Sequence, residues 1–332
     1  MAYDIAQKFV IGIASSALFD LTESHRIYLE QGEEEYRKYQ ERNINVILER
    51  GVAFPFIRRF LNINMHFAAL APVEVVLFSR NSPETGLRVM RSIQHYGLDI
   101  SRAVFVTGKP PYPYLPAFNA SLFLSANEDD VRKALACKHP AGLVLPSRPR
   151  DHPSSSGHQG AGDVAADDGA GDDDELRVAF DFDGVIADDE AETVFKRHND
   201  VDEFHAHETM HAATAHQPGP LADLFQKLAA MQKLQQEAQR NDPAYTKILR
   251  IAIITARSAP SHERVVTTLK SWGVAADETF FLGGMDKARV LAVFKPHIFF
   301  DDQLNHLKSM DSSIPMVHVP FGVANLRPAP ES

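Results

Sequence analysis

Short apolar runs recur along the chain, and segments with helical periodicity separate them. Val178–Phe180, Ile251–Ile254 and Ile298–Phe300 are hydrophobic at every position. Continuous runs of this kind are typical of parallel strands that helices cover on both faces. Strands that alternate with helices predict a parallel sheet with crossover connections, so we expect the α/β fold class.

The order of these elements occurs twice. Residues 74–133 align with residues 250–309 without a gap, which places Ser79 on Thr255. Upstream, the segment VIGIASSALFD resembles RVAFDFDGVIA. Self-similarity of this length indicates an internal duplication. We therefore predict two similar parallel-sheet (Rossmannoid) domains.

Length and composition agree with two domains. The chain has 332 residues, of which 44% are hydrophobic and 23% charged, so a sizeable core can form. There is no apolar run of the roughly 20 residues that span a bilayer and no signal-peptide pattern, so we expect no membrane partner. The single cysteine, Cys137, excludes an intramolecular disulfide and fits the reducing cytoplasm. The net charge of −10 disfavours nucleic acid as a partner.

Much of the negative charge lies in one segment. Residues 151–175 contain eight Asp or Glu residues, five glycines and no Lys or Arg. Such a composition buries too little apolar surface to offset the entropy of ordering. We interpret residues 147–175 as a flexible acidic linker between a first block, 1–146, and a second block, 176–332. An acidic segment that binds a cation or a partner is the alternative.

Chemically competent side chains follow the apolar runs of the second block, where ligands bind in parallel sheets. The candidates are Asp181, Asp183, Thr255, Lys287, Asp301 and Asp302. Residues i and i+2 of a strand point the same way, so Asp181 and Asp183 can face one pocket. Gly184 then allows the chain to turn away.

This set of groups suits phosphoryl transfer. Clustered carboxylates repel one another, so a hard cation such as Mg2+ is expected among Asp181, Asp183, Asp301 and Asp302. One aspartate can attack phosphorus, and a second can protonate the leaving oxygen and later deprotonate water. A hydroxyl and an amine can stabilise charge on the phosphoryl oxygens.

In their order and placement these motifs resemble the haloacid dehalogenase (HAD) superfamily. The matching segments are DFDGVIAD, the threonine of IITAR, Lys287 and FFDD. The resemblance implies that Asp181 is the nucleophile and Asp183 the acid–base. Thr255 and Lys287 would contact the phosphate, and Asp301 and Asp302 would help to hold Mg2+.

The segment between the first two motifs resembles the small helical cap of HAD enzymes, at about residues 189–247. An apolar stripe at helical spacing, which we interpret as packing, includes Leu221, Leu224, Phe225, Leu228 and Met231. Phe204, His205, His207 and Glu208 lie in a histidine-rich piece and are expected at the cap surface or at the substrate. A zinc site there lacks cysteine and clean ligand spacing. Arg257 and Ser258 are further candidates for substrate contact, with a role at the start of a helix as the alternative.

The chain is similar over nearly its whole length to the cytosolic 5′-nucleotidase I family. The similarity rests on EFHAHE and GPLADLFQKL in the insertion, on ITARSA, LKSWG and PHIFFDDQ, and on SSALFD and YLPAFNASLFLSA in the first block. It implies Mg2+-dependent hydrolysis of nucleoside 5′-monophosphates, AMP foremost, through an aspartyl-phosphate. It also implies a cytoplasmic homo-oligomer and activation by a nucleoside diphosphate effector. The first motif, DFDGV, follows the general HAD pattern DxDGV. It therefore indicates the reaction type and does not indicate which substrate is preferred.

The first block lacks the acidic groups of the second. Ala14 stands in the place of Asp181, and Ser125 stands in the place of Asp301. We therefore predict a degenerate, non-catalytic copy. Ser79, Arg80 and Asn81 at a strand end are candidate regulatory residues that would bind a nucleotide phosphate; helix capping and interface support are the alternative.

Two other functions remain open. The motifs do not specify the leaving group, so a sugar-phosphate phosphatase or a phosphotransferase is one alternative. A non-catalytic nucleotide-binding scaffold is the other.

Overall fold

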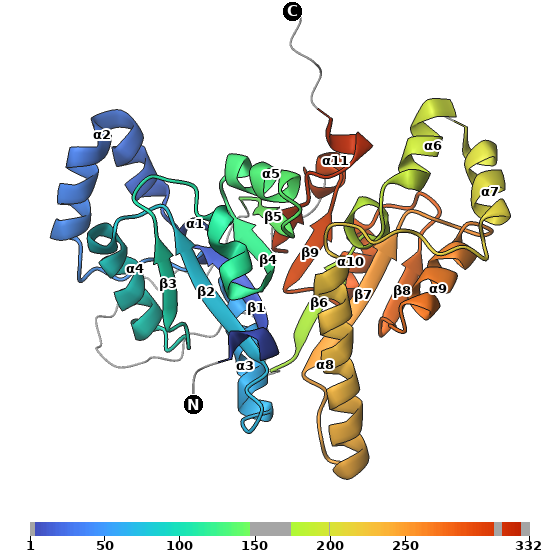
Figure 1. Ribbon diagram of the computed structural model, residues 1–332, viewed down its shortest axis with the longest axis horizontal. Coiled ribbons are helices and arrows are strands. Elements are labelled where there is room, and N and C mark those ends of the chain that lie inside the picture. The colour runs from blue at the N-terminus through green and yellow to red at the C-terminus, as the bar shows by residue number, and fades with distance from the viewer. Residues whose placement is uncertain (1–3, 147–173, 199, 309–313, 327–332) are drawn as a thin grey trace, which may run out of the picture.

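One continuous ten-stranded sheet runs through the computed structural model, which describes residues 4–146, 174–198, 200–308 and 314–326 (Figure 1). The strand order is β3-β2-β1-β4-β5-β10-β9-β6-β7-β8. In chain order the strands are β1 (Phe9–Ala14), β2 (Val73–Ser79), β3 (Arg102–Phe105), β4 (Ala120–Ser125), β5 (Ala141–Val144), β6 (Leu176–Phe180), β7 (Leu249–Thr255), β8 (Glu278–Phe281), β9 (Ile298–Asp301) and β10 (Met316–His318).

The sheet consists of two five-stranded halves with the same order of strands. Within each half all pairs are parallel, and the halves join where β5 and β10 pair in antiparallel register, Val317 opposite Val144. The predicted α/β class is confirmed. The two blocks therefore share one sheet, which the sequence did not predict.

Helices cover both faces of the sheet and its edges. They are α1 (Ser15–Leu18), α2 (Thr22–Arg42), α3 (Phe54–His66), α4 (Pro83–His95), α5 (Glu128–Ala136), α6 (Glu190–His198), α7 (Val201–Met210), α8 (Ala222–Asn241), α9 (His262–Ser271), α10 (Ala288–Phe294) and α11 (Leu304–Lys308). Short 3-10 helices occur at η1 (Ile5–Gln7), η2 (Tyr112–Phe118) and η4 (Val323–Asn325), and η3 (Phe182–Ile186) is an irregular turn. In Figure 1, α2 of the first half and α6 and α7 of the second lie on the same, upper side of the molecule.

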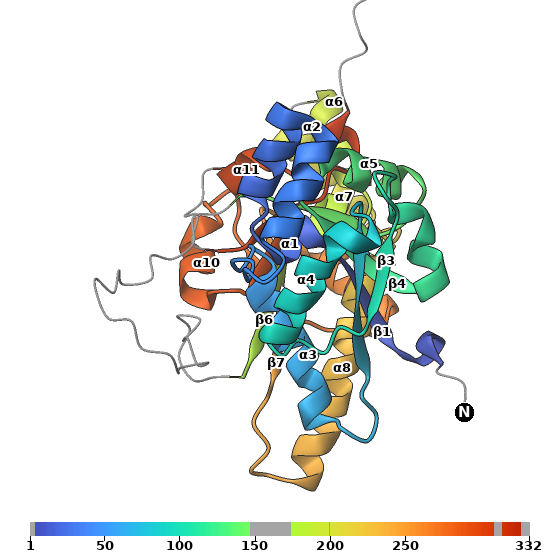
Figure 2. The same ribbon diagram turned by 90° about the vertical axis from the view of Figure 1, so that its left-hand side faces the viewer.

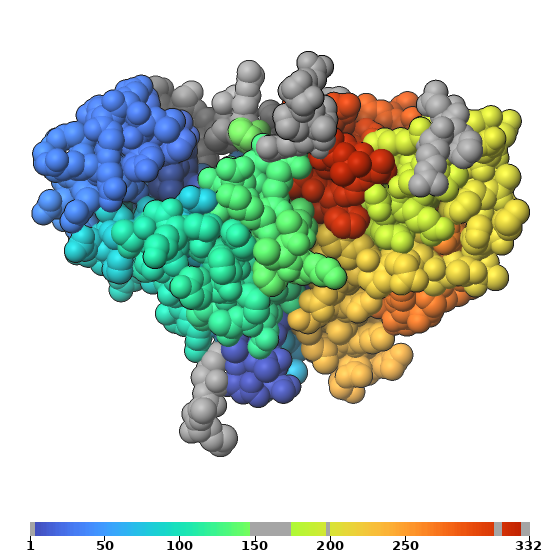
Figure 3. Space-filling model, turned by 45° about the horizontal axis from the view of Figure 1, so that its top comes forward, coloured from blue at the N-terminus to red at the C-terminus, as the bar shows by residue number. Residues whose placement is uncertain are grey.

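Helices α3 and α8 lie side by side at the seam between the halves, as both ribbon views show (Figures 1 and 2). Helix α3 contacts β6 of the second half, and α8 contacts β4 of the first. The Lys227 ammonium on α8 donates to the Ser121 hydroxyl at 2.5 Å, and the rings of Phe67 and Tyr245 lie 6.4 Å apart. The seam is thus closed by helices as well as by the strand pair. The space-filling view shows the C-terminal segment, in red, between the two halves (Figure 3).

The core of the second half is built around aromatic rings. Phe180 stacks on Phe300 with ring centroids 5.0 Å apart and meets the edge of Phe225 at 5.7 Å. The predicted packing stripe of α8 is confirmed, because Leu221, Leu224, Phe225 and Leu228 are buried and Met231 is partly buried against them. Helix α8 therefore lies against β7 on the sheet, although residues 189–247 were expected to form a cap. The part of this insertion that stands at the strand ends is α6 and α7.

The expected linker lies outside the described residues except at its end. There, the Glu175 carboxylate accepts from Arg177 at 3.0 Å and from Arg250 at 3.4 Å. Among the described residues, no helix combines the length and the apolar character needed to cross a membrane.

Phe225 tests the packing of α8 on the sheet. Phe225→Ala removes a fully buried ring, so we expect a loss of about 3–5 kcal/mol in the free energy of unfolding, measured by urea denaturation. The control, Val293→Ala, changes a side chain that is 83% exposed and should stay within about 0.5 kcal/mol of the wild type. A similar small change for both variants would contradict the packing described above.

Candidate active site

Asp181 and Asp183 lie where β6 passes into the irregular turn η3. The Asp181 carboxylate accepts a hydrogen bond from the backbone N–H of Phe182 at 2.7 Å, and Phe182 itself is fully buried. Gly184 has a φ of +69°, and a Cβ atom there would lie 2.7 Å from Oδ2 of Asp302. Position 184 requires glycine for two reasons. Other residues rarely adopt this φ, and a side chain would collide with Asp302.

A buried lysine joins two of the predicted aspartates. Lys287, at the start of α10, places its Nζ 2.6 Å from Oδ2 of Asp181 and 2.7 Å from Oδ2 of Asp301. All three side chains are almost completely buried. The structure therefore brings the first, third and fourth motifs together at the carboxyl ends of β6 and β9, as the sequence predicted.

The site holds more carboxyl groups than Lys287 alone can balance if all of them are ionised. Burial, together with the charges of Asp181, Asp301 and Glu192, raises the pKa of Asp302 to about 9. Burial also raises the pKa of Asp181 to about 7, with Asp301 and Asp183 adding to the shift and Lys287 opposing it. For Asp301, burial is outweighed by Lys287 and His306, which hold its pKa below the usual value.

The donor set fits a hard cation. Oδ1 of Asp302 is buried and receives no hydrogen bond from the residues that the structure describes. Donor atoms of Asp181, Asp301 and His306 lie within 4.8 Å of one another. An orphaned carboxylate oxygen beside further carboxylates is the arrangement that Mg2+ or a similar oxygen-preferring ion requires. Asp181, Asp301 and Asp302 would hold it. Asp183 was also expected among the ligands, but both of its carboxylate oxygens accept hydrogen bonds from Arg257.

Thr255 and Arg257 extend the site along the end of β7. The Thr255 hydroxyl is buried and accepts from the backbone N–H of Arg257 at 3.3 Å. The Arg257 guanidinium grips Asp183 with two hydrogen bonds, Nε to Oδ2 at 2.8 Å and Nη2 to Oδ1 at 2.7 Å. Arg257 was expected to contact substrate. In this structure its donors are engaged by side chains of the protein and by the carbonyl of Ser261.

The candidates on α7 differ in exposure. Phe204, His205 and His207 are partly exposed, which is compatible with substrate contact. Glu208 was expected at the surface or at the substrate, but it is completely buried and pairs with Arg257 and Arg264. The reason is that Glu208 faces the cationic side chains after β7, which enclose it. Ser258 is partly exposed, and its carbonyl accepts from Ser261 and His262 at the start of α9.

In the first half the corresponding strand ends carry no comparable charge cluster within the described residues. The hydroxyls of Ser15 and Ser79 lie 3.2 Å apart. The regulatory candidate Arg80 is paired with Asp130 at 2.6 and 2.8 Å, and the side-chain Oδ1 of Asn81 accepts from the Tyr36 hydroxyl at 2.8 Å. Arg80, which was predicted to bind a nucleotide phosphate, thus has a carboxylate partner within the protein.

Several residues at the site escaped the sequence analysis. His306, five residues after Asp301, has its Nδ1 3.3 Å from Oδ2 of that aspartate. Arg264 on α9 and His216 before α8 are buried beside Glu208. The nearness of His306 to the FFDD motif was a signal that could have found it. His216 belongs to the same histidine-rich piece as Glu208, whereas Arg264 comes from a separate segment that only folding brings to Glu208.

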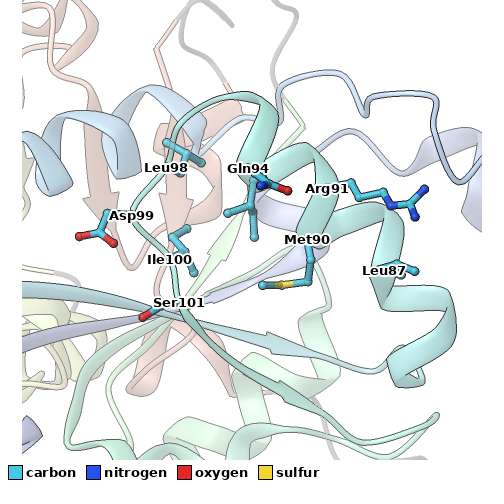
Figure 4. A pocket seen from close by; sticks show the side chains of 9 residues that line it. Leu87, Met90, Arg91, Gln94, Leu98, Asp99, Ile100 and Ser101 are labelled. Carbon is cyan, nitrogen blue, oxygen red and sulfur yellow. The ribbon is translucent and has the colours of Figure 1, made fainter. Parts of the chain in front are cut away.

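A surface pocket of about 420 Å3 lies elsewhere, between α4 and the segment that leads into β3 (Figure 4). Its walls include Leu87, Met90, Leu98 and Ile100. None of the predicted catalytic residues lines it, so it is not the candidate active site.

The fold and the charges at the strand ends define an α/β protein with an acidic site at the carboxyl edge of its sheet, and the donor set of this site fits a cation. The sequence profile of the family described as 5′-nucleotidase matches residues 1–326. The chain is also 35% identical to human cytosolic 5′-nucleotidase 1B over 304 residues, which is 90% of this chain and 46% of that protein. The chain thus spans about half the length of this curated relative. No solved structure matched it significantly.

The chain therefore belongs to the 5′-nucleotidase family, and the similarity to cytosolic 5′-nucleotidases of type I that the sequence indicated is confirmed.

The raised pKa values predict that divalent-cation binding releases protons. With Asp302 at a pKa of about 9, its carboxyl group is protonated at neutral pH, and a bound cation requires the ionised form. The apparent affinity for Mg2+ should therefore increase as the pH rises from neutrality through this pKa. Calorimetry in buffers of different ionisation enthalpy would measure the proton release. The variant Asp302→Asn should release fewer protons when the cation binds. Cation binding that does not depend on pH and releases no protons would contradict the raised pKa of Asp302.

Proposed function

We propose that this protein hydrolyses nucleoside 5′-monophosphates, AMP foremost, in a Mg2+-dependent reaction through an aspartyl-phosphate. The observation that carries the proposal is the buried Asp181–Lys287–Asp301 cluster, with the orphaned oxygen of Asp302 beside it. Family membership supports the reaction class. The substrate preference rests on the family resemblance.

Asp181 is the nucleophile in this proposal. An oxygen of its carboxylate forms a bond to phosphorus, and the bond from phosphorus to the 5′-oxygen breaks. Lys287, held 2.6 Å from Asp181, orients the carboxylate and supplies positive charge near the phosphoryl oxygens. Thr255, at the end of the neighbouring strand, offers its hydroxyl to one of those oxygens. A bound Mg2+ ion would offset repulsion between the carboxylates and the phosphate.

Asp183 is the acid–base. It gives a proton to the departing 5′-oxygen, because a sugar alkoxide is a poor leaving group. It then takes a proton from the water that attacks the phosphorus of the aspartyl-phosphate. The bond between phosphorus and Asp181 breaks in that step, which releases inorganic phosphate and restores the Asp181 carboxylate.

We assign catalysis to residues 176–332 and regard residues 1–146 as a degenerate copy. The identical strand order of the two halves supports a duplication, as do the matching positions of α3 and α8. Ala14 stands where the second half has Asp181, and Ser125 stands where it has Asp301, which supports the loss of catalysis in the first half. In this proposal α6 and α7 form the cap, and Phe204, His205 and His207 contact the nucleoside.

The wider context of the enzyme is proposed on the same resemblance. The protein would act in the cytoplasm, the location stated in the name of its human relative. A homo-oligomer and a nucleoside diphosphate effector are part of the proposal, whereas nucleic acid and membranes are not.

Asp181→Asn tests the proposal. We expect it to reduce phosphate release from AMP by at least about 10⁴-fold, because the amide cannot act as the nucleophile. Circular dichroism should show an unchanged fold. Phosphate release from AMP, IMP, CMP and a sugar phosphate, with Mg2+ and then with EDTA, would define the substrate class. Full activity in EDTA, or substantial activity of the variant, would refute the proposal.

A further inference from the structure

Glu208 is a completely buried carboxylate near the site, and the proposed chemistry does not use it. It lies on α7, in the insertion, and its exposed fraction is 0%. Burying an ionised carboxylate is costly unless charged partners surround it. The partners of Glu208 therefore indicate what keeps it there.

Four side chains contact the Glu208 carboxylate. Oε2 pairs with Nη1 of Arg257 and lies 3.3 Å from Nε2 of His216. Oε1 accepts from Nη1 of Arg264 at 2.8 Å and lies 3.2 Å from Nδ1 of His207. Arginine and histidine groups outweigh the cost of burial, and they hold the pKa of Glu208 well below its usual value.

Arg257 connects Glu208 with Asp183 in the turn η3. One edge of its guanidinium, Nε and Nη2, holds both oxygens of Asp183, while Nη1 faces Glu208. A planar guanidinium has a fixed fork of donors, so its position determines the position of a carboxylate bound in this two-point manner. A shift of the Arg257 guanidinium would therefore shift the Asp183 carboxylate as well.

Helix α7 fixes Arg257 from a second direction. The guanidinium carbon lies 5.6 Å from the ring centre of Phe204 and 5.5 Å from that of Phe182. Phe204 and Glu208 are four residues apart and so lie on one face of the helix. That face therefore supplies both a ring and a counter-charge to the arginine. Asp183 has no direct contact with α7 among the described hydrogen bonds and ion pairs, so the connection runs through Arg257.

We propose that Glu208 is a positioning residue for the acid–base Asp183 and acts through Arg257. The insertion thereby contributes to the chemical step as well as to substrate contact. This inference rests on the function proposed above. It assigns a role to the insertion that the proposed function does not need.

The leaving group provides a specific test. In AMP the 5′-oxygen needs a proton as it leaves, whereas a sulfur in the same bridging position leaves as a thiolate without one. AMP and its 5′-bridging thio analogue therefore form a matched pair of substrates. Glu208→Gln should lower kcat/KM for AMP by about 10- to 100-fold, a part of the contribution of a general acid, and lower it for the thio analogue by less than about 3-fold. The ratio of the two values does not depend on how much of the variant is folded.

Controls separate positioning from a general structural role. Glu203→Gln makes the same chemical change at an exposed position of α7 and should leave both values unchanged. Glu208→Asp keeps the charge and should recover part of the loss for AMP. Combining Glu208→Gln with Asp183→Asn should cause no loss beyond that of Asp183→Asn alone, because both act on one group.

Each outcome decides between the proposals. Equal losses for AMP and the thio analogue, or an additive double variant, would overturn the positioning role and leave the proposed function intact. No loss for AMP in Glu208→Gln would also overturn it. If the wild type releases phosphate from neither substrate in the presence of Mg2+, the proposed function fails and this inference fails with it.

Discussion

The interaction on which the site depends is the pairing of one buried lysine with two buried aspartates. Lys287 stands between Asp181 and Asp301, at distances of 2.6 and 2.7 Å, and Oδ1 of neighbouring Asp302 receives no hydrogen bond from the described part of the chain. The charges cannot relax by moving apart, because β6 and β9 are adjacent strands with Phe180 opposite Phe300. The stacked rings of those two residues hold the strand ends in place. A stable core thus keeps together carboxylates that would otherwise repel one another.

The same sheet edge carries a second charged cluster. Each of the two clusters contains one of the two aspartates of the turn η3. Asp181 belongs to the lysine cluster, whereas Asp183 belongs to the arginine cluster of Arg257 and Glu208. Phe182 lies between them and is fully buried, with the guanidinium of Arg257 near its ring. The proposed nucleophile and the proposed acid–base, two residues apart, therefore have different charged surroundings. In the proposed mechanism, this difference in surroundings allows two chemically identical side chains to take different roles.

The local pattern was enough to predict the strands, the packing helix and the lysine cluster. Apolar runs and the residues directly after them lie close together in sequence, and parallel strands bring their carboxyl ends to one edge. The prediction was weaker for residues on the insertion. Glu208 reads as a surface residue because α7 is polar on most of its sides. The partners that bury it, Arg257 and Arg264, follow it by about fifty residues.

The sequence by itself determined the α/β class, the repeated order of elements and which strand ends carry carboxylates, because each depends on periodicity or on neighbouring positions. Tertiary structure alone decided that the two halves share one sheet through β5 and β10 and that α8 packs on that sheet. It also decided that Glu208 and Asp183 hold opposite sides of one arginine. The pairing of β5 with β10 and the ion pairs of Arg257 join segments that lie far apart in the chain. These partners come within reach of one another only after the sheet has formed, so the sequence pattern does not reveal them.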